Sequence, residues 1–414
     1  MLNKLNLYRL LVFLLGLISY LILSQFLDVQ LSEGVMFDYF NLEADSYSYY
    51  EVGQWIYHQT PSPNLAYRPV LFPFTLVSLF KVGGVWAIFI YHIVIYCWSH
   101  YLIHMAVKKI SKSVVTATLA SFLFLSNFTL IGLTYHGLSE PTVIFGLSLI
   151  LYLLAIKISH KIYPERFWSL LIVAISLLVL VKPVFLIPAL VVLLLAAYLL
   201  IRKKMRFTKK IIISICISVG MLVGQASIVK YNFGEFKISK IGEVTYKNYL
   251  FSQVYLHKTQ MSRAYSMEAV NNMSNIELKD FVTSNLKLTV RTFCYNIIDN
   301  IQADPFMQVY KDEECSKESV QYMKTYNIFL FYFLLLIALL TSLQALLIYK
   351  SNPKRSLLIL GILFLLVYMV CITGIAYGQR DRLIITSMPL WIFLGTLMLN
   401  PRDVKSGFWL NKKD

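Results

Sequence analysis

The sequence predicts an all-α polytopic membrane protein, and three observations carry this prediction. Of the 414 residues, 57% are hydrophobic and only 14% are charged, whereas soluble domains carry about 25% charged residues. Apolar runs of about 20 residues, the length that crosses a bilayer as a helix, recur along the chain. Basic residues gather in alternate loops, as the positive-inside bias requires.

About ten apolar segments are predicted to span the membrane. The first lacks a small-residue cleavage site and is long enough to remain as a span. Segment 69–80 is apolar but too short to cross alone, and Pro69 and Pro73 disfavour a regular helix start, so we expect a half-crossing or broken helix there. If this segment and a neighbour each cross, the number becomes eleven or twelve. The predicted spans are 7–27, 85–107, 113–133, 139–157, 166–183, 184–201, 210–229, 327–349, 356–377 and 383–399.

The charge pattern predicts that both chain ends lie in the cytoplasm. With the N-terminus inside, the short cytoplasmic loops and the two tails hold more than half of the 38 Lys and Arg residues and few of the acids. The net charge of +16 is therefore assigned to membrane topology, and no nucleic-acid partner is expected. The predicted location is a cell membrane, the inner or plasma membrane of a bacterium.

Three regions are predicted. Residues 1–229 form an N-terminal transmembrane catalytic module that includes an extracytoplasmic loop at 28–84. Residues 230–326 form a large extracytoplasmic loop or subdomain, and residues 327–414 hold the C-terminal spans and a cytoplasmic tail.

Cys294 and Cys315 share the large loop and form a disulfide if that loop is in an oxidising compartment. The five cysteines lack Cys-x-x-Cys spacing, which argues against a zinc site.

The stretch from Glu43 to Pro73 is the main candidate for a functional site. It opens with acids, continues through a segment rich in Tyr and Trp, and ends with Arg68-Pro69 and a Phe-Pro pair. No other stretch combines carboxylates, aromatic rings and a basic residue so closely beside a predicted span.

Several polar residues are predicted at the outer ends of spans, where such groups are costly unless they are used. They would converge on one extracytoplasmic cavity, with a carboxylate to take a proton and cations to hold a phosphate. The candidates are Asp45 in the first loop, His136 and Glu140 between the third and fourth spans, Lys182 between the fifth and sixth, and Arg380, Asp381 and Arg382 between the last two. Tyr49 and Tyr50 of the first loop are candidates to stack on a sugar.

Each candidate also has a structural interpretation. Asp45 is a possible N-cap of the Tyr-rich segment, and the tyrosines are a possible interfacial aromatic belt. Arg68 would then reach lipid headgroups, and Glu140 before Pro141 would complement a helix dipole. The Arg-Asp-Arg at 380–382 would be a self-paired turn. The agreement of all of them on one membrane face favours a functional site.

The order of these features resembles the GT-C superfamily of membrane glycosyltransferases, in particular bacterial members akin to protein O-mannosyltransferases and the lipid A aminoarabinose transferase. The matching pieces are ADSYSYYEVGQWI and YRPVLFPFTL in the first loop, LSEPTVIFGLSLILYLL, LVKPVFLIPALVVLLLAAYLL, and RDRLIITSMPLWIFL near the end. The resemblance covers residues 1–210 and, more loosely, the last forty.

The resemblance implies a GT-C-like bundle with a first-loop juxtamembrane helix, and it implies roles for named residues. Asp45 would be the catalytic base, with Glu43 as the alternative. Arg68, Lys182, Arg380 and Arg382 would bind the phosphate of a polyprenyl-phosphate sugar donor. Family members often have paired Asp-Glu in the first loop, whereas this chain has Glu-Ala-Asp-Ser, so the need for a divalent metal ion stays open.

The predicted function is transfer of a sugar, with inversion or retention, from that donor to a cell-envelope glycan, lipid or protein acceptor. One alternative is a flippase or transporter of a lipid-linked glycan, which would place charges near the middle of several spans. Another is an envelope polysaccharide polymerase or ligase, which also has many spans and one long outer loop.

Overall fold

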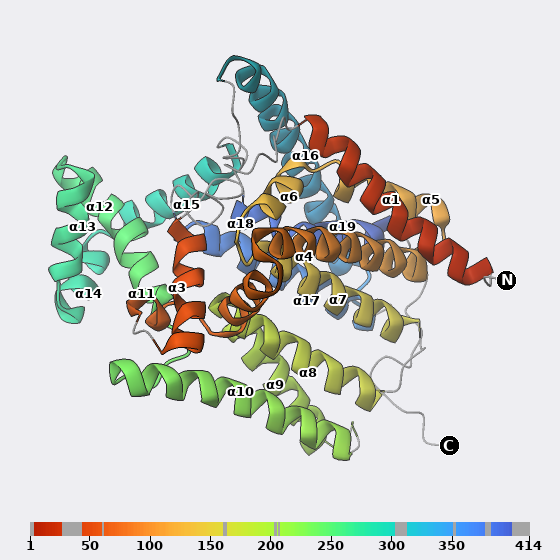
Figure 1. Cartoon of the computed structure of the whole chain (residues 1–414), viewed down its shortest axis with the longest axis horizontal. Coiled ribbons are helices and arrows are strands. Elements are labelled where there is room, and N and C mark those ends of the chain that lie inside the picture. The colour runs from red at the N-terminus through yellow and green to blue at the C-terminus, as the bar shows by residue number, and fades with distance from the viewer. Residues whose placement is uncertain are drawn as a thin grey trace.

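The structure of the protein is a computed structural model. It describes residues 4–26, 44–59, 62–159, 164–202, 205, 208–302, 313–350, 353–376 and 382–399. These residues fold into helices, and no β-strand occurs among them. The long helices form a bundle, and a group of shorter helices between residues 241 and 302 extends from one end of it (Figure 1). The all-α prediction is confirmed for this part of the chain.

Eight helices within the described ranges are long and apolar enough to cross a membrane. They correspond to eight of the predicted spans, so the prediction of a polytopic membrane protein is confirmed. They are α1 (Lys4–Phe26), α4 (Leu71–Ser111), α7 (Glu140–Ile158), α8 (Pro164–Val181), α9 (Leu186–Ile201) together with the 3₁₀ turn before it, α10 (Lys209–Phe233), α16 (Glu313–Leu347) and α17 (Pro353–Thr373).

The other two predicted spans are each divided. Segment 113–133 consists of α5 (Val114–Leu125) followed by α6 (Phe128–Gly132) and the 3₁₀ turn η2 (Leu133–Tyr135), with a bend of 61° between the parts. Asn127 allows this bend because its side chain caps the new helix, accepting the backbone N–H of Leu130 at 3.0 Å. Segment 383–399 consists of α18 (Arg382–Ile385) and the short apolar α19 (Met388–Leu399).

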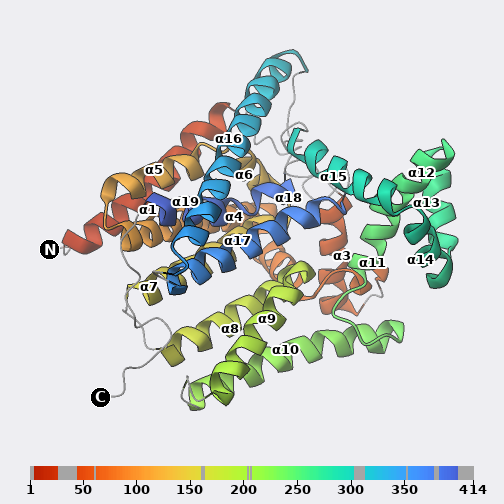
Figure 2. The ribbon, with the colours of Figure 1, turned by 180° about the vertical axis from the view of Figure 1, so that it is seen from behind.

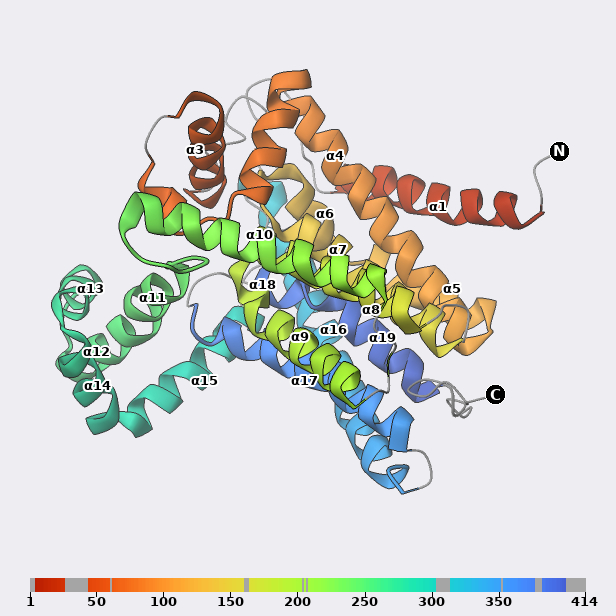
Figure 3. The same cartoon turned by 90° about the horizontal axis from the view of Figure 1, so that it is seen from below.

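The break expected near residues 69–80 lies slightly later in the chain. α4 begins at Leu71 and loses helical geometry at Gly83 and Gly84. Gly84 has φ of +62°, a left-handed conformation that glycine adopts without steric cost. The kink turns the first part of α4 away from the rest of the helix, and this part packs beside α3 (Ala44–His58) (Figure 3).

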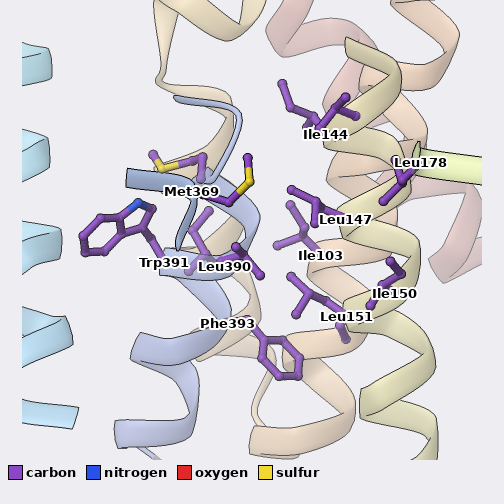
Figure 4. Packing of buried hydrophobic residues seen from close by; sticks show 14 of the residues in the cluster. Ile103, Ile144, Leu147, Ile150, Leu151, Leu178, Met369, Leu390, Trp391 and Phe393 are labelled. Carbon is purple, nitrogen blue, oxygen red and sulfur yellow. The ribbon is translucent and has the colours of Figure 1, made fainter. Parts of the chain in front are cut away.

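The core lies where α4, α7, α8, α17 and α19 meet, and its packing explains why the site residues of several elements are held together. Ile103 of α4, Leu147 of α7 and Phe393 of α19 point toward one another in it (Figure 4). Gly146 brings α7 and α8 close, because a Cβ there would lie 2.4 Å from a methyl group of Leu178. Seen from behind, α16 and α17 cover α19 (Figure 2).

The large loop predicted at 230–326 is described at 230–302 and 313–326, and it is mostly helical there, although residues 234–240 are not. Its first residues belong to α10 and its last to α16. It contains α11 (Ile241–Thr245), the π-helical turn η4 (Tyr246–Phe251), α12 (Ser252–Thr259), α13 (Arg263–Asn272), α14 (Asn275–Ser284) and α15 (Leu286–Gln302). Cys294 is exposed on α15. The side chain of Cys315 lies outside the described residues, so the disulfide stays a prediction.

Candidate active site

The first-loop helix α3 is fixed against the start of α4 by close contact. A Cβ at Gly53 would lie 2.1 Å from a Val77 methyl group and 2.7 Å from the Pro73 carbonyl oxygen, so only glycine fits there. The ring of Tyr49 packs edge-on against Phe72, with 4.9 Å between centroids. Because α3 is held in this way, Asp45 in its first turn has a defined position.

Arg68 reaches back to α3 from the short connection before α4. The 3₁₀ turn η1 (Pro63–Ala66) is capped by Ser62, whose Oγ accepts the Asn64 N–H at 3.2 Å. Arg68 follows this turn, and its Nη2 donates to Asp45 Oδ1. Its Nε donates to Ser48 Oγ at 2.9 Å, so the guanidinium is oriented by two residues of α3.

Arg382 approaches the same carboxylate from the other end of the sequence. It is the first residue of α18, and its Nη2 donates to Asp45 Oδ2. Its Nε lies 3.8 Å from Glu140 Oε1, so one guanidinium lies between two carboxylates. The Arg382 side chain is only 6% exposed, which makes these contacts the main compensation for its charge.

Glu140 and Lys182 complete the group. Glu140 begins α7, and Lys182 lies between α8 and the 3₁₀ turn η3 (Pro183–Phe185). Lys182 Nζ donates to Glu140 Oε1 at 2.8 Å, and the Glu140 side chain is 3% exposed. We call Asp45, Arg68, Glu140, Lys182 and Arg382 the cavity charge cluster.

The cluster holds Asp45 in its ionised form. Burial alone would raise the pKa of the Asp45 carboxyl, but the positive charges of Arg68 and then Arg382 outweigh it and lower the pKa well below its usual range. Nearby His136 is instead held in its uncharged form. Burial, Arg382 and His92 lower its pKa to about 3, so its imidazole is neutral at physiological pH.

The cluster lines one end of a cavity of about 780 Å³. The remainder of the cavity wall is largely apolar, with Leu186 and Leu190 from α9 and Leu222 and Val223 from α10. A cavity with a charged end and an apolar body suits an amphiphilic ligand that has a phosphate and a hydrocarbon chain.

The segment 236–249 forms another wall of this cavity. It is tied to the connection that carries Arg68, because Ser239 Oγ donates to the Tyr67 carbonyl at 2.6 Å and the Lys240 N–H donates to the Ala66 carbonyl at 2.8 Å. Gln225 of α10 strengthens the link, since it accepts the Val70 N–H at 3.1 Å and donates to the Ile238 carbonyl at 3.2 Å.

Sequence reasoning missed the tyrosines of this wall. Tyr246 and Tyr249 both line the cavity and both lie in the π-helical turn η4. Such turns are rare in proteins, and those that occur are often at functional sites. No sequence pattern reveals a π-turn, and the loop carried no recognisable motif, so only the aromatic content of the segment pointed to it.

A row of histidines along α4 was also missed. His92, Tyr96, His100 and His104 are four residues apart, so they share one face of the helix, and all four are buried. The row begins near the cluster, where His92 Nδ1 lies 3.3 Å from the Thr134 carbonyl oxygen. At its other end His104 Nε2 is 2.6 Å from the hydroxyl of Tyr8 on α1. The spacing alone would have revealed it.

Six of the residues predicted for the site lie together at the cavity: Tyr49 and the five members of the cavity charge cluster. Tyr50 is not among its lining residues, since its ring packs edge-on against Phe80 at 5.7 Å. His136 is fully buried behind the cavity wall. Glu43 and Arg380 lie outside the described residues.

The tyrosines of α3 are distributed over two environments. Tyr49 contacts the cluster, since its hydroxyl lies 2.9 Å from Ser139 Oγ and Arg68 lies over its ring. Tyr57 instead stacks on Phe74 and has Lys81 above its ring at 3.6 Å, away from the cavity lining. The segment is thus neither a uniform interfacial belt nor a uniform substrate wall.

Among the described residues, no three His, Cys, Asp or Glu side chains are grouped in a way that could hold a metal ion.

Comparison of the chain with protein-family models, with curated proteins and with solved structures gives no significant match.

Proposed function

We propose that this protein is a membrane glycosyltransferase of GT-C type that moves a sugar from a polyprenyl-phosphate donor to a cell-envelope glycan, lipid or protein acceptor. One observation carries the proposal: the Asp45 carboxylate is shared by Arg68 and Arg382 in the wall of a large, mostly apolar cavity. In this proposal the chain crosses a bacterial inner or plasma membrane about ten times, and the cavity opens on the extracytoplasmic side.

The charge of the cluster suits the phosphate of such a donor. Three cations face two carboxylates, which leaves one positive charge. A sugar-phosphate-polyprenyl diester carries one negative charge, so its binding would neutralise the site. Arg68 and Arg382 present planar donor groups that match phosphate oxygens, and Lys182 adds a point charge.

The apolar body of the cavity suits the lipid part of the donor. Leu186, Leu190, Leu222 and Val223 line it, and they come from α9 and α10, which are membrane-spanning helices. A polyprenyl chain could therefore lie against these helices while its phosphate reaches the cluster. Tyr246 and Tyr249 on the opposite wall offer rings on which a sugar could stack.

The proposed reaction uses Asp45 as the base. The acceptor hydroxyl oxygen bonds to the anomeric carbon of the donor sugar, the bond from that carbon to the phosphate oxygen breaks, and polyprenyl phosphate leaves with the electron pair. The hydroxyl proton passes to Asp45. Because donor phosphate attracts Arg68 and Arg382, it weakens their hold on Asp45 and raises its basicity when the substrate is present. The cations then stabilise the departing phosphate.

The test compares a deletion strain of the native host complemented with wild type, Asp45→Asn or Glu235→Gln. Surface glycans and lipid-linked intermediates are analysed by mass spectrometry. We expect the deletion and Asp45→Asn strains to lack one sugar and to accumulate the acceptor, because loss of a general base costs about 10²–10⁴-fold in rate. Glu235→Gln, a change in an exposed ion pair, should restore the sugar.

Two outcomes would overturn the proposal. A normal glycan in the Asp45→Asn strain would remove Asp45 from the chemistry. Complete glycan units that remain on their lipid carrier would identify a flippase, polymerase or ligase, since those proteins act on finished units. Membrane levels of each variant, measured by immunoblot, separate a lost activity from a lost protein.

The histidine row of α4 favours a second candidate, proton-coupled transport of a lipid-linked glycan. His92 to His104 extends over about 18 Å of helix, and chains of buried histidines serve as proton relays in transporters. If this candidate holds, the protein in liposomes with a pH gradient will conduct protons, and His100→Phe will not. Absence of proton flux through the wild-type protein would remove it.

A further inference from the structure

The helix α15 has an unusual distribution of polar and apolar residues. It buries four polar side chains and exposes apolar ones, the reverse of a helix on the surface of a soluble domain. The buried residues are Thr289, Thr292, Asn296 and Asn300. The exposed apolar residues are Leu286, Val290, Tyr295 and Ile298.

The buried polar face is explained by its partner, the C-terminal end of α17. The last carbonyl groups of a helix have no partner within the helix. Asn296 Nδ2 donates to the Gly374 carbonyl at 3.0 Å, and Asn300 Nδ2 donates to the carbonyls of Thr373 and Ala376 at 3.0 Å each. The two asparagines thus satisfy the end of α17.

The contact between the two helices is also sterically close. A Cβ at Gly374 would lie 2.7 Å from the ring of Phe293 and 2.9 Å from Ile297. α15 therefore has a fixed place at the end of α17, and the apolar stretch of α17 that is long enough to span a membrane, Ser356–Thr373, ends there. This places α15 at the depth where hydrocarbon gives way to headgroups.

The exposed face of α15 has the composition of a helix at a membrane surface. Val290 and Ile298 are exposed by 54% and 49%, and the basic side chains of Lys287 and Arg291 share their side of the helix. Apolar residues flanked by Lys and Arg are the features of helices that lie in the interface of a bilayer with anionic lipids. α15 also runs crosswise to the spans α8 and α10 (Figures 1 and 3).

We propose that α15 lies in the plane of the membrane surface, with Val290 and Ile298 among the acyl chains and Lys287 and Arg291 on anionic headgroups. Ile372, Ile375 and Ala376 at the end of α17 line the cavity. Lipid contact on one side of α15 therefore fixes the position of a cavity wall on the other. This assignment is independent of the reaction that the cavity performs.

The first experiment uses the unaltered protein in nanodiscs of zwitterionic and anionic phospholipids, one of which has a photoreactive diazirine on an acyl chain. Peptide mass spectrometry maps the lipid cross-links. We expect cross-links within 286–302 at several-fold higher yield than within 275–284, which forms α14. Ile276 on α14 is 75% exposed and gives a matched apolar control. Equal yields on both helices would overturn the proposal.

The second experiment measures immersion directly. Cys294 lies on the exposed side of α15, and a variant with its other four cysteines changed to alanine is labelled there with an environment-sensitive fluorophore. Quenching by nitroxide lipids but not by iodide is expected, and a label at Lys279→Cys on α14 should show the reverse. A label shielded from both quenchers indicates a protein partner or second copy, and one quenched by iodide indicates water; both results contradict lipid contact.

The basic residues provide a third comparison. The double change Lys287→Gln and Arg291→Gln should reduce the cross-linking yield of anionic lipid at least two-fold and leave that of zwitterionic lipid unchanged. An equal reduction for both lipids would mean that the two side chains hold the helix in place without recognising headgroups, which contradicts the proposed role.

Discussion

Two clusters in which one carboxylate meets two cations adjoin the same cavity. In the first, Asp45 contacts Arg68 and Arg382. In the second, Glu235 contacts Lys237 at 2.6 Å and Lys240 at 2.5 Å. The lysine cluster joins residues at most five positions apart and is the more exposed of the two, since the Glu235, Lys237 and Lys240 side chains are 42%, 51% and 22% exposed. The arginine cluster joins elements far apart in the chain, and its Asp45, Arg68 and Arg382 side chains are 29%, 16% and 6% exposed.

The difference in exposure predicts how strongly each cluster is held together. An exposed pair of lysine and glutamate is screened by salt and contributes little. Two well-buried cations around a half-buried carboxylate are more costly to separate, so the Asp45 cluster is held together more firmly. Three charges of the same signs thus contribute little in the exposed cluster, whereas in the Asp45 cluster they form the proposed binding site.

The largest expected effect comes from removal of a shared arginine. Arg382→Gln removes one of the two arginines that contact Asp45 and one of the two cations beside Glu140. If the cluster stabilises a departing phosphate, the sugar-transfer rate should fall about 10²–10³-fold. Lys240→Gln likewise removes one positive charge from the Glu235 cluster and should leave the rate within two-fold of wild type. Similar losses in both variants would erase the distinction between the clusters.

The next effect is on stability. Glu140→Gln removes the carboxylate that Lys182 contacts and leaves Arg382 with its contact to Asp45. Breaking a buried pair costs about 3–5 kcal/mol. We expect the lower end of this range because the Lys182 side chain is 20% exposed. The double variant Glu140→Gln with Lys182→Met should recover most of the loss. Unfolding in mixed micelles measures this, and additive effects of the two changes would contradict pairing.

The smallest effect is the pH dependence of stability. The pKa of Asp45 is lowered in the folded protein, so its stabilising contribution is full above its unfolded pKa of about 3.9 and is lost as pH falls through the folded value. The pKa of Glu235 is lowered to about 2 by hydrogen bonds from Lys237 and Lys240, which gives the same sign.

Salt separates these two contributions. Between pH 5 and pH 3 the melting temperature of wild type should fall more than that of Asp45→Asn, and about 1 M NaCl should change this difference little. The corresponding difference for Glu235→Gln should disappear in the same salt. An Asp45 difference that salt also removes would show that the carboxylate is open to solvent.

Much of the membrane fold follows from the sequence because hydropathy is a local property. A run such as Leu186 to Ile201 is apolar in any context, and it forms α9. The kink at Gly83 and Gly84 is harder to predict from the sequence, because glycines also occur in straight spans. Its position was missed by a few residues for that reason.

Only part of the candidate site could be predicted from the sequence. Asp45, Arg68, Glu140, Lys182 and Arg382 were chosen from their predicted place at span ends, and the structure brings them together. Tyr246 and Tyr249 could not be found in this way, because their place at the cavity depends on the fold of segment 236–249. The reversed polarity of α15 was equally hidden, since Asn296 and Asn300 need the end of α17 to explain them.

Arg382 has a consequence for how the protein is made. It lies 337 positions after Asp45, and membrane helices are synthesised and inserted from the N-terminus onward. Before α18 is inserted, the described cluster holds two acids, Asp45 and Glu140, and two cations, Arg68 and Lys182, so its charges balance. Arg382 adds the third cation and with it the net positive charge. A chain cut before residue 382 would insert its early spans with a neutral cluster and would lack the charge that we propose holds the donor phosphate.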